Sequence, residues 1–526
     1  MKGSHHRGSA YIRHGRRNFL KWAGLGTVGL MTAGLQPFTE PLFARSVLDS
    51  GFSPDLDFSL VAENGQAEIF RGSPTGVWKF RPRLHKGDSD RVESIPGSYL
   101  GPIVKVRRGE KIRIRLLNKL PEETIVHWHG LHVPSAMDGH PRDVVGPGQR
   151  YIYEFTVANR AGTYWYHPHP HGRTGPQVYG GLAGLFIVSD EEEKSLGLPD
   201  GDHDVPLVIQ DRTFDRGNQL VYTSGHPMEQ MTGFLGDRIL VNGRPDATLS
   251  VSTGVYRLRL LNGSNSRIYK LAWGDGRPMV VIATDGGLLE TPVRRRYVFL
   301  APGERIELWA DFSRDPVGDR LDLVSLPFDA GASGGRAMGR GMRMRGGARS
   351  LPNGASFTVC RIEVERKVRD DRRLPQRLFE IGPAETGEAV NIANPRRFFL
   401  TMQHMQWTIN GRTFRMEEVA DDEVVRIGTK EVWEFANTAG AMGMMHMADM
   451  PHPMHLHGKQ FRVLYRTGVR HNGYVDEGWK DTVLVMPGER VKILAGFEDH
   501  PGLFLYHCHN LEHEDMGMMR NYYIKS

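Results

Sequence analysis

The chain has 526 residues, which at roughly 100 to 200 residues per domain allows about three domains. Hydrophobic residues make up 39% of it, enough for a core in each domain, so intrinsic disorder is excluded as the main state. The formal net charge of +6 is small and no polybasic block occurs, so the charge does not indicate a nucleic-acid partner. Only two cysteines, Cys360 and Cys508, stand against 23 His and 22 Met, which excludes a disulfide scaffold and favours copper as a bound metal.

The amino terminus has the layout of an export signal. Residues 1–21 carry basic residues and no acid, and an apolar, Gly-rich stretch follows at 22–35. That stretch is shorter than the roughly 20 residues that span a bilayer, and residues 16–21 resemble a twin-arginine signal. We therefore expect residues 1–45 to be a twin-arginine export signal, recognised by the twin-arginine translocase, and the mature protein to be periplasmic or otherwise exported without a stable membrane anchor. The alternative is a disordered basic tail.

Two short motifs recur along the chain in a fixed order. The first is a run of alternating apolar and polar residues, typical of a half-buried strand, found at residues 109–118, 254–262 and 430–437. The second is a Pro-Gly turn followed by a further alternating run, found at residues 146–150, 301–305 and 486–490. The repetition predicts three copies of one antiparallel β-unit.

Many short strands with Gly and Pro turns predict an all-β fold of three consecutive Greek-key β-sandwich domains. We expect these domains at residues 50–198, 199–366 and 395–526, with a linker at 367–394. The second domain is predicted to be a metal-free spacer, because residues 200–366 contain only two histidines.

His-x-His pairs recur at four places, two in the first unit and two in the third, at matching positions relative to the two motifs. On a strand, residues i and i+2 point to the same face about 6.6 Å apart, so each pair presents two imidazoles to one cavity. We expect these histidines to converge between the first and third units. They are His127 and His129, His167 and His169, His455 and His457, and His507 and His509.

Cys508 lies between the last two of these histidines. Together with His452, His513 and Met518 it offers one thiolate, two imidazoles and one thioether, which is the ligand set of a blue-copper site. A single His-x-His pair would indicate no more than a surface or core pair, but four pairs combined with this set favour metal binding.

With these residues the chain resembles the three-domain multicopper oxidases, the family of laccase and ascorbate oxidase, and within it the bacterial copper efflux oxidases. The resemblance spans about residues 50–526 and implies three cupredoxin-like domains with one type 1, one type 2 and two type 3 copper ions. The implied ligands are His452, Cys508, His513 and Met518 for type 1, His127 and His455 for type 2, His129, His167 and His509 for one type 3 ion, and His169, His457 and His507 for the other.

The resemblance also implies roles in electron and proton transfer. Cys508 is joined by the backbone to His507 and His509, so we expect it to conduct electrons from the type 1 site to the type 3 pair. Asp138 and Glu514 match the acidic positions that relay protons to O2 in the family. The alternatives are that Asp138 is an ordinary turn residue and that Glu514 only orients the loop carrying a ligand.

A methionine-rich stretch at residues 441–451 precedes His452 directly. Copper efflux oxidases seat a labile substrate copper on Met and Asp residues at this place, and the candidates here are Asp449, Met450, Met447 and Met445. Thioether sulfur selects Cu(I), so we expect an additional cuprous docking site. The alternative is adaptable methionine packing around a hydrophobic laccase pocket.

A second segment, residues 331–350, mixes Met and Arg with many glycines and is expected to be flexible. Its methionines would trap Cu(I), and a solvated loop without a metal role is the equal alternative. An arginine-glycine tail for nucleic acid is disfavoured in an exported enzyme.

The sequence therefore favours a multicopper oxidase that couples one-electron oxidation of Cu(I) and of phenols to reduction of O2 to water, with a role in copper tolerance. We expect a monomer whose partners are O2 and Cu(I) or phenolic small molecules. The alternative is a laccase or bilirubin-oxidase type of phenol or pigment oxidase without a dedicated Cu(I) site. Copper-free cell-division relatives and copper carriers are disfavoured, because the ligand set is complete.

Overall fold

The computed structural model describes residues 51–222, 227–331, 351–437, 449–468 and 472–526. The predicted export signal at 1–45 lies outside the described residues. So do Met445, Met447 and all of the segment 331–350 except Gly331. Within the described part, no helix is both long and apolar enough to cross a membrane.

The first sandwich consists of two sheets that enclose a core of aliphatic and aromatic side chains. One sheet has the order β2 (Thr75–Lys86), β1 (Leu56–Ala67), β5 (Lys111–Asn118) and β7 (Arg150–Thr156). The other has the order β3 (Val92–Glu93), β4 (Ile103–Arg107), β9 (Gly184–Ser189), β8 (Gly162–Pro168) and β6 (Val126–His129). Burial alternates along β5, as its apolar and polar alternation predicts.

The second sandwich has its own core, which includes Cys360, a buried cysteine without a disulfide. One sheet has the order β12 (Arg244–Pro245), β11 (Arg238–Val241), β10 (Asp204–Arg212), β14 (Val255–Asn262), β19 (Arg305–Asp311), β16 (Met279–Thr284) and β17 (Gly287–Arg295). The other has the order β13 (Thr248–Ser252), β21 (Phe357–Arg366), β20 (Arg320–Ser325), β15 (Tyr269–Trp273) and β18 (Val298–Leu300).

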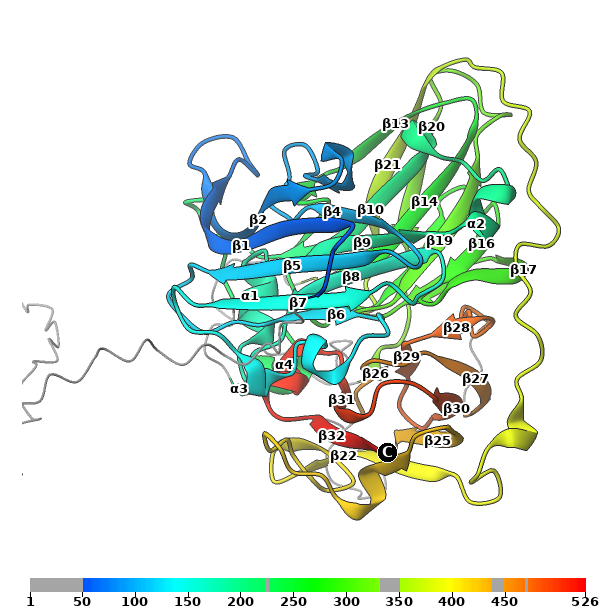
Figure 1. Ribbon diagram of the computed structural model, residues 1–526. Helices are drawn as coiled ribbons and strands as arrows, with labels where there is room; N and C mark the ends of the chain where they lie inside the picture. Colours follow the sequence, from blue (N-terminus) through cyan, green and yellow to red (C-terminus); the bar gives the residue numbers. More distant parts are fainter. Residues whose placement is uncertain (1–50, 223–226, 332–350, 438–448, 469–471) are drawn as a thin grey trace, which may run out of the picture. The chain divides into compact units, whose positions relative to one another are not determined.

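The third sandwich contains the carboxyl-terminal strands, drawn in yellow to red in Figure 1. One sheet has the order β23 (Gln406–Ile409), β22 (Arg396–Gln403), β25 (Thr429–Asn437), β30 (Arg490–Phe497), β27 (Phe461–Thr467) and β28 (Trp479–Lys480). The other has the order β24 (Val424–Arg426), β32 (Met519–Lys525), β31 (Gly502–Cys508), β26 (His452–Leu456) and β29 (Thr482–Val485). The fold is therefore all-β with three cupredoxin-like sandwiches, as predicted.

In the described part of the chain, four short α-helices connect the strands: α1 (Thr174–Gly180), α2 (Glu191–Ser195), α3 (Pro227–Thr232) and α4 (Leu511–Asp515). Helices α1 and α4 lie side by side, because the carboxylate of Asp515 accepts hydrogen bonds of 2.8 Å from the backbone N–H groups of Thr174 and Gly175. This contact attaches the segment that follows Cys508 to the first sandwich.

The two repeated motifs are bonded to each other in all three sandwiches. The strand motif ends in Asn118, Asn262 or Asn437, and the side-chain amide of each donates to the carbonyl just before the Pro-Gly turn of its own unit, at 2.8, 2.8 and 3.1 Å. The backbone N–H of the turn glycine donates back to the same asparagine's carbonyl. The fixed order of the two motifs therefore reflects the same hydrogen bonding between strand end and turn in each unit.

The prediction of a purely antiparallel unit is wrong. Each sandwich contains two parallel pairs, which are β1 with β5 and β4 with β9, β10 with β14 and β13 with β21, and β22 with β25 and β24 with β32. Alternation of apolar and polar residues reports burial of one strand face and carries no information on the direction of the neighbouring strand.

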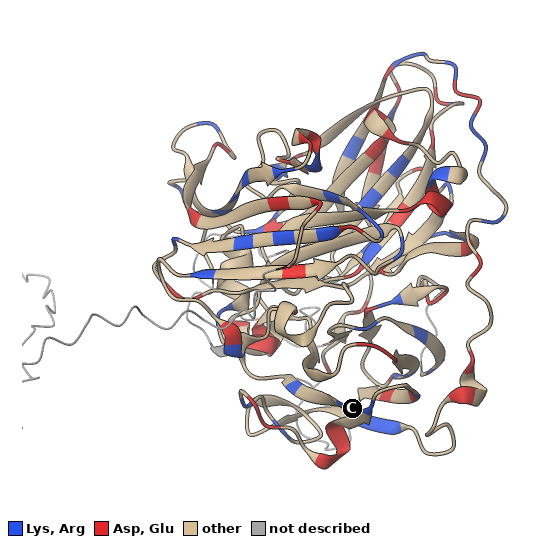
Figure 2. Cartoon of the chain, in the orientation of Figure 1, with Lys and Arg blue, Asp and Glu red and all other residues tan. Residues whose placement is uncertain are grey.

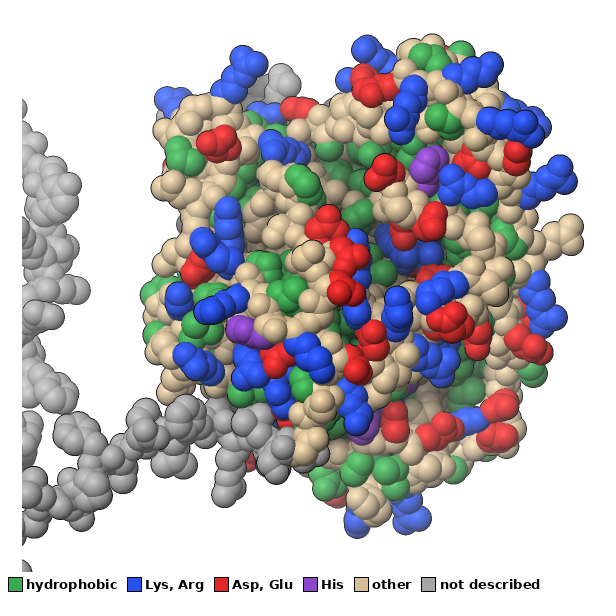
Figure 3. Space-filling view, turned by 45° about the horizontal axis from the view of Figure 1, so that its top comes forward, with side chains coloured by type: hydrophobic (Ala, Val, Ile, Leu, Met, Phe, Trp, Pro, Cys, Tyr) green, Lys and Arg blue, Asp and Glu red, His purple; other side chains and the backbone are tan. Residues whose placement is uncertain are grey.

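Charges of both signs are interspersed on the same strands (Figure 2), and the face in Figure 3 shows the same mixture. On β5, for example, Arg113 pairs with Glu154 and Arg115 pairs with Asp57. These basic side chains are therefore paired locally with acidic ones.

Candidate metal centre

The strand register brings the predicted histidines together within each half-site. In the first sandwich β6 pairs with β8 so that His127 lies opposite His167, and in the third β26 pairs with β31 so that His455 lies opposite His507. His129 ends β6, whereas His169, His457 and His509 follow their strands directly. The ring centroids of the opposed pairs lie 5.5 and 5.4 Å apart.

The two half-sites face each other, and all eight rings are completely buried. The Nε2 atoms of His127 and His455 lie 3.3 Å apart, and the Nε2 atom of His507 lies 3.4 Å from that of His169 and 3.0 Å from that of His457. We call these eight histidines the histidine cluster. It joins the first and third sandwiches, as the sequence predicts.

The hydrogen bonds of the outer ring nitrogens establish which tautomer the inner nitrogens have. His127 Nδ1 donates to the carbonyl of Asp138 and His455 Nδ1 donates to the carbonyl of Asp481, both at 2.7 Å. Because a carbonyl only accepts, each Nδ1 carries a proton, and in this tautomer the lone pair of the ring lies at Nε2. Two lone pairs that face each other at 3.3 Å repel, and a cation bound by both nitrogens would relieve that repulsion.

Five further ring nitrogens in the cluster have no hydrogen-bond partner among the described residues. One is His169 Nδ1, and the other four belong to three neighbouring rings: His129 Nδ1, His167 Nε2 and both nitrogens of His509. These three rings lie close together, with centroids 4.9 to 5.6 Å apart. These are the three histidines assigned to one type 3 copper by the resemblance. Buried polar atoms normally have hydrogen-bond partners. A bound metal ion would be the partner that these nitrogens lack.

Burial keeps these rings neutral, which is the form of imidazole that binds metals. Loss of hydration, reinforced by the charges of neighbouring imidazoles, lowers the pKa of His509 to about 3. The same two causes hold the pKa values of other cluster members well below the ordinary range, namely His129, His167, His169, His455 and His457.

Cys508 ends β31 and forms a second cluster with two histidines. Its Sγ lies 3.4 Å from Nδ1 of His452 and 3.7 Å from Nδ1 of His513, and Met518 is packed in the same core cluster. All four side chains are completely buried. Burial raises the pKa of the Cys508 thiol, so a bound cation would be needed to hold it as thiolate.

The outer ring nitrogens of His513 and His452 have different surroundings. His513 lies in α4, and its Nε2 donates at 2.9 Å to the carbonyl of Met231 in α3, which also accepts 2.8 Å from the indole N–H of Trp407. In contrast, Nε2 of His452 is buried without a hydrogen-bond partner among the described residues. His452 therefore has an unpartnered outer nitrogen, although Trp407 lies 4.8 Å from its ring.

Both predicted proton donors lie against the histidine cluster. Asp138 accepts a 2.8 Å hydrogen bond from Nδ1 of His457, and a carboxylate oxygen of Glu514 lies 3.1 Å from Nδ1 of His507. Within the described part of the chain, Asp138 Oδ1 and both Glu514 oxygens are buried without a hydrogen-bond partner. The neighbouring imidazoles of His169 and His507 hold the pKa of Glu514 well below its usual range, despite its burial.

Of the predicted Cu(I) ligands, only two fall among the described residues. The side chain of Met450 is 1% exposed and packs in the core of the third sandwich. Asp449 is half-buried, and its Oδ1 is a buried atom without a hydrogen-bond partner among the described residues. A role in seating copper remains a prediction for both.

The sequence interpretation missed several residues that contact the predicted ligands. Asp481 and Thr482 hold His129 and His455, and Trp165 stacks on His167 with centroids 4.3 Å apart. Trp165 stands two residues before His167, so its position on the strand was the available signal. Nothing in the order of residues indicated the contact between Met231 and His513.

Known proteins share both the sequence and the fold. Residues 81–193 and 390–526 match family profiles described as multicopper oxidase. The multicopper oxidase mco of Staphylococcus aureus is 33% identical across 84% of this chain and 86% of its own length. The chain therefore belongs to the multicopper oxidase family, which implies copper as its cofactor.

Solved structures agree with this assignment. The McoA multicopper oxidase of Aquifex aeolicus is 36% identical, with a TM-score of 0.75 over 90% of this chain and 97% of its own. A multicopper oxidase of Campylobacter jejuni, described as a metallo-oxidase, is 27% identical, with a TM-score of 0.70 over 89% of this chain and 91% of its own.

Proposed function

We propose that this multicopper oxidase couples one-electron oxidation of Cu(I), and less selectively of phenols, to the four-electron reduction of O2 to water, and that it serves copper tolerance. The observation that carries the proposal is the pair of buried clusters joined through Cys508. In the cluster around Cys508, Nε2 of His452 has no hydrogen-bond partner among the described residues. The histidine cluster joins the first and third sandwiches.

The proposed copper ligands follow the sequence assignment. His452, Cys508, His513 and Met518 would hold the type 1 ion, and His127 with His455 the type 2 ion. His129, His167 and His509 would hold one type 3 ion, and His169, His457 and His507 the other. The facing lone pairs and the unpartnered ring nitrogens support this assignment.

When bound, copper supplies single-electron transfer at the type 1 site and reduction of O2 at the other three ions. Cys508 contributes a thiolate and a backbone connection to both His507 and His509. Complete burial of the histidine cluster excludes bulk water, which strengthens each electrostatic interaction in the site. Asp138 and Glu514, which contact the proposed ligands His457 and His507, would relay protons toward the reacting oxygen.

The surroundings of the type 1 ligands favour Cu(I) over an organic substrate. In a laccase-type reaction an aromatic substrate needs access to a ligand edge, but Trp407 lies against both type 1 histidines, with ring centroids 4.8 Å from His452 and 4.7 Å from His513. The Met231 carbonyl also occupies the outer nitrogen of His513. Asp449 stands three residues before His452 and has a buried oxygen without a hydrogen-bond partner among the described residues. A carboxylate near a histidine ligand would suit a metal ion as electron donor.

The alternative is a laccase or bilirubin-oxidase-like enzyme without a dedicated Cu(I) site. The burial of Met450 favours this alternative, because a thioether that packs in the core serves to fill space between apolar side chains.

Oxygen uptake by the copper-loaded protein distinguishes the two functions. Cu(I) and a simple phenol are supplied separately, each with and without added Cu(II). We expect a fast Cu(I) rate, and phenol turnover that rises when Cu(II) is added, because a seated copper would relay electrons from the phenol. Fast phenol turnover that does not respond to Cu(II) would favour the alternative.

We further propose that residues 1–45 direct export by the twin-arginine pathway to the periplasm, and that the mature protein acts as a monomer. The division into domains at 50–198, 199–366 and 395–526 is likewise our proposal. Its support is that each of the three pairs of sheets falls within one of these ranges.

A further inference from the structure

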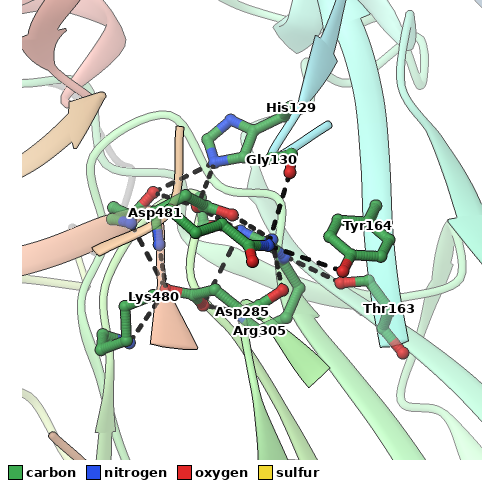
Figure 4. A network of polar contacts seen from close by, with 12 residues as sticks. His129, Gly130, Thr163, Tyr164, Asp285, Arg305, Lys480 and Asp481 are labelled. Carbon is green, nitrogen blue, oxygen red and sulfur yellow. Dashed lines mark hydrogen bonds and ion pairs between the residues drawn. The ribbon is translucent and has the colours of Figure 1, made fainter. Parts of the chain in front are cut away.

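The second sandwich carries none of the proposed ligands, yet it reaches the histidine cluster (Figure 4). A Cβ added to Gly303, in its Pro-Gly turn, would lie 3.0 Å from a carbon of the His509 ring and 3.1 Å from a carbon of the His129 ring. Gly303 has a φ of +84°, a conformation that favours glycine. The turn is therefore packed directly against two proposed type 3 ligands.

Arg305 begins β19 two residues later and is completely buried. Its guanidinium donates to both carboxylate oxygens of Asp481, at 2.7 and 2.5 Å. The remaining N–H groups donate to the carbonyls of Thr163, Gly303 and Asp285 at 2.9 to 3.0 Å. All five donors of the guanidinium have acceptors, and these acceptors come from all three sandwiches.

Asp481, the acceptor in the third sandwich, contacts two proposed ligands. Its Oδ1 accepts a 3.0 Å hydrogen bond from Nε2 of His129, and its carbonyl accepts the 2.7 Å bond from Nδ1 of His455. These bonds hold the protons on the outer nitrogens and leave His129 Nδ1 and His455 Nε2 directed into the cluster. Asp481, together with the hydroxyl of its neighbour Thr482, therefore holds both rings in position.

We propose that Arg305 is a positioning residue of the oxygen-reducing site, acting through Asp481 on His129 and His455. The second domain is then a structural part of the trinuclear copper site, beyond its predicted role as a spacer. This inference rests on the copper assignment under the proposed function.

The charges around Arg305 explain why a neutral or shorter side chain cannot replace it. Asp285 and Asp481 both lie against the guanidinium, with Arg305 Nη1 3.7 Å from Asp285 Oδ1. Lys480 already pairs with Asp285 and Glu304, at 2.9 and 3.2 Å. Loss of the planar bidentate contact would leave the Asp481 carboxylate held only by His129 and Thr482 and facing a second buried carboxylate.

The test compares three copper-loaded variants with the wild type. Arg305→Lys keeps the charge but loses the bidentate hydrogen bonds to Asp481. Asp481→Asn keeps the shape and volume of the side chain, and it serves as the second variant if Arg305→Lys does not fold. Arg257→Lys is the matched control, because Arg257 is equally buried in the second sandwich and pairs with Glu307 and Glu193 instead of Asp481. The readouts are copper bound per chain, the blue absorption of the Cys508 site and the paramagnetic resonance of the type 2 copper.

We expect Arg305→Lys and Asp481→Asn to retain the blue absorption, to change the type 2 resonance and to weaken copper binding at the trinuclear site by about 10- to 100-fold. Arg257→Lys should match the wild type in all three readouts. An unchanged type 2 resonance and copper content in both variants would overturn the inference. Equal loss of the blue and type 2 signals would also overturn it, since that result indicates a role in folding alone. A wild-type protein that lacks both signals would refute the proposed function and this inference with it.

Discussion

At the scale of single residues, the tautomers of the histidines define what the cluster can bind. His127 and His455 each donate a proton from Nδ1 to a backbone carbonyl, so their inner nitrogens face each other as bare lone pairs. Sequence spacing identified the histidines, but the protonated nitrogen depends on carbonyls contributed by residues far along the chain, which spacing does not reveal.

Asp138 offers a test of proton supply. In Asp138→Asn the amide oxygen still accepts the hydrogen bond from Nδ1 of His457, whereas the side chain no longer carries a proton to O2. We expect oxygen turnover to fall by about 10- to 100-fold with the copper spectra intact. Asp143→Asn, in the adjacent 3-10 turn, is the control and should keep wild-type turnover. Undiminished turnover in Asp138→Asn would show that Asp138 is an ordinary turn residue without a role in proton transfer.

The two described residues of the proposed Cu(I) site are expected to differ in effect. Asp449→Asn removes the carboxylate three residues before His452 and should raise the KM for Cu(I) while phenol oxidation stays unchanged. Met450→Leu preserves the volume of a core side chain, so its fold should be unaffected. Steady-state oxygen uptake measures both, and unchanged Cu(I) kinetics in both variants would favour methionine packing around a laccase pocket.

At the scale of the secondary-structure elements, the asparagine at the end of each strand motif closes its unit. Asn118→Ala removes side-chain hydrogen bonds to the carbonyls of Glu122 and Val145, and it removes the acceptor of the buried N–H of Leu120. We expect the first sandwich to lose about 1–3 kcal/mol of stability, seen as a lower thermal midpoint. Asn394→Ala, at an exposed position, is the control, and equal midpoints for the two variants would contradict this role.

The repeated motifs predicted the sandwiches and the paired half-sites because strand alternation and turns are local properties. What they could not predict depends on packing between units. Arg150, Arg305 and Arg490 occupy the same place in the turn motif, yet the first and third are exposed and only Arg305 is buried against Asp481. The parallel strand pairs were missed for the same reason, since direction is a property of the partner strand.

At the scale of the whole molecule, the histidine cluster joins residues from the first and third sandwiches. An ion that binds both half-sites binds the folded state in preference to the unfolded one, so copper should stabilise the protein by mass action. We expect removal of copper by a chelator to lower the thermal midpoint, and restoration of copper to recover it.

Cys508→Ser is the comparison for this experiment, because it should lose the blue absorption while keeping most of the stabilisation supplied by the histidine cluster. Identical midpoints for the metal-free and copper-loaded wild type would contradict a metal-bridged interface.

The most direct test of the central claim, that one buried cysteine joins an electron-accepting site to an oxygen-reducing site, is the stoichiometry of oxygen use. Cu(I) is supplied to the copper-loaded protein, and oxygen consumed, Cu(I) oxidised and hydrogen peroxide formed are measured together in the wild type and in Cys508→Ser. The account predicts four Cu(I) oxidised for each O2 with no peroxide in the wild type, and loss of this turnover in Cys508→Ser. Peroxide as the product, or wild-type turnover in Cys508→Ser, would contradict it.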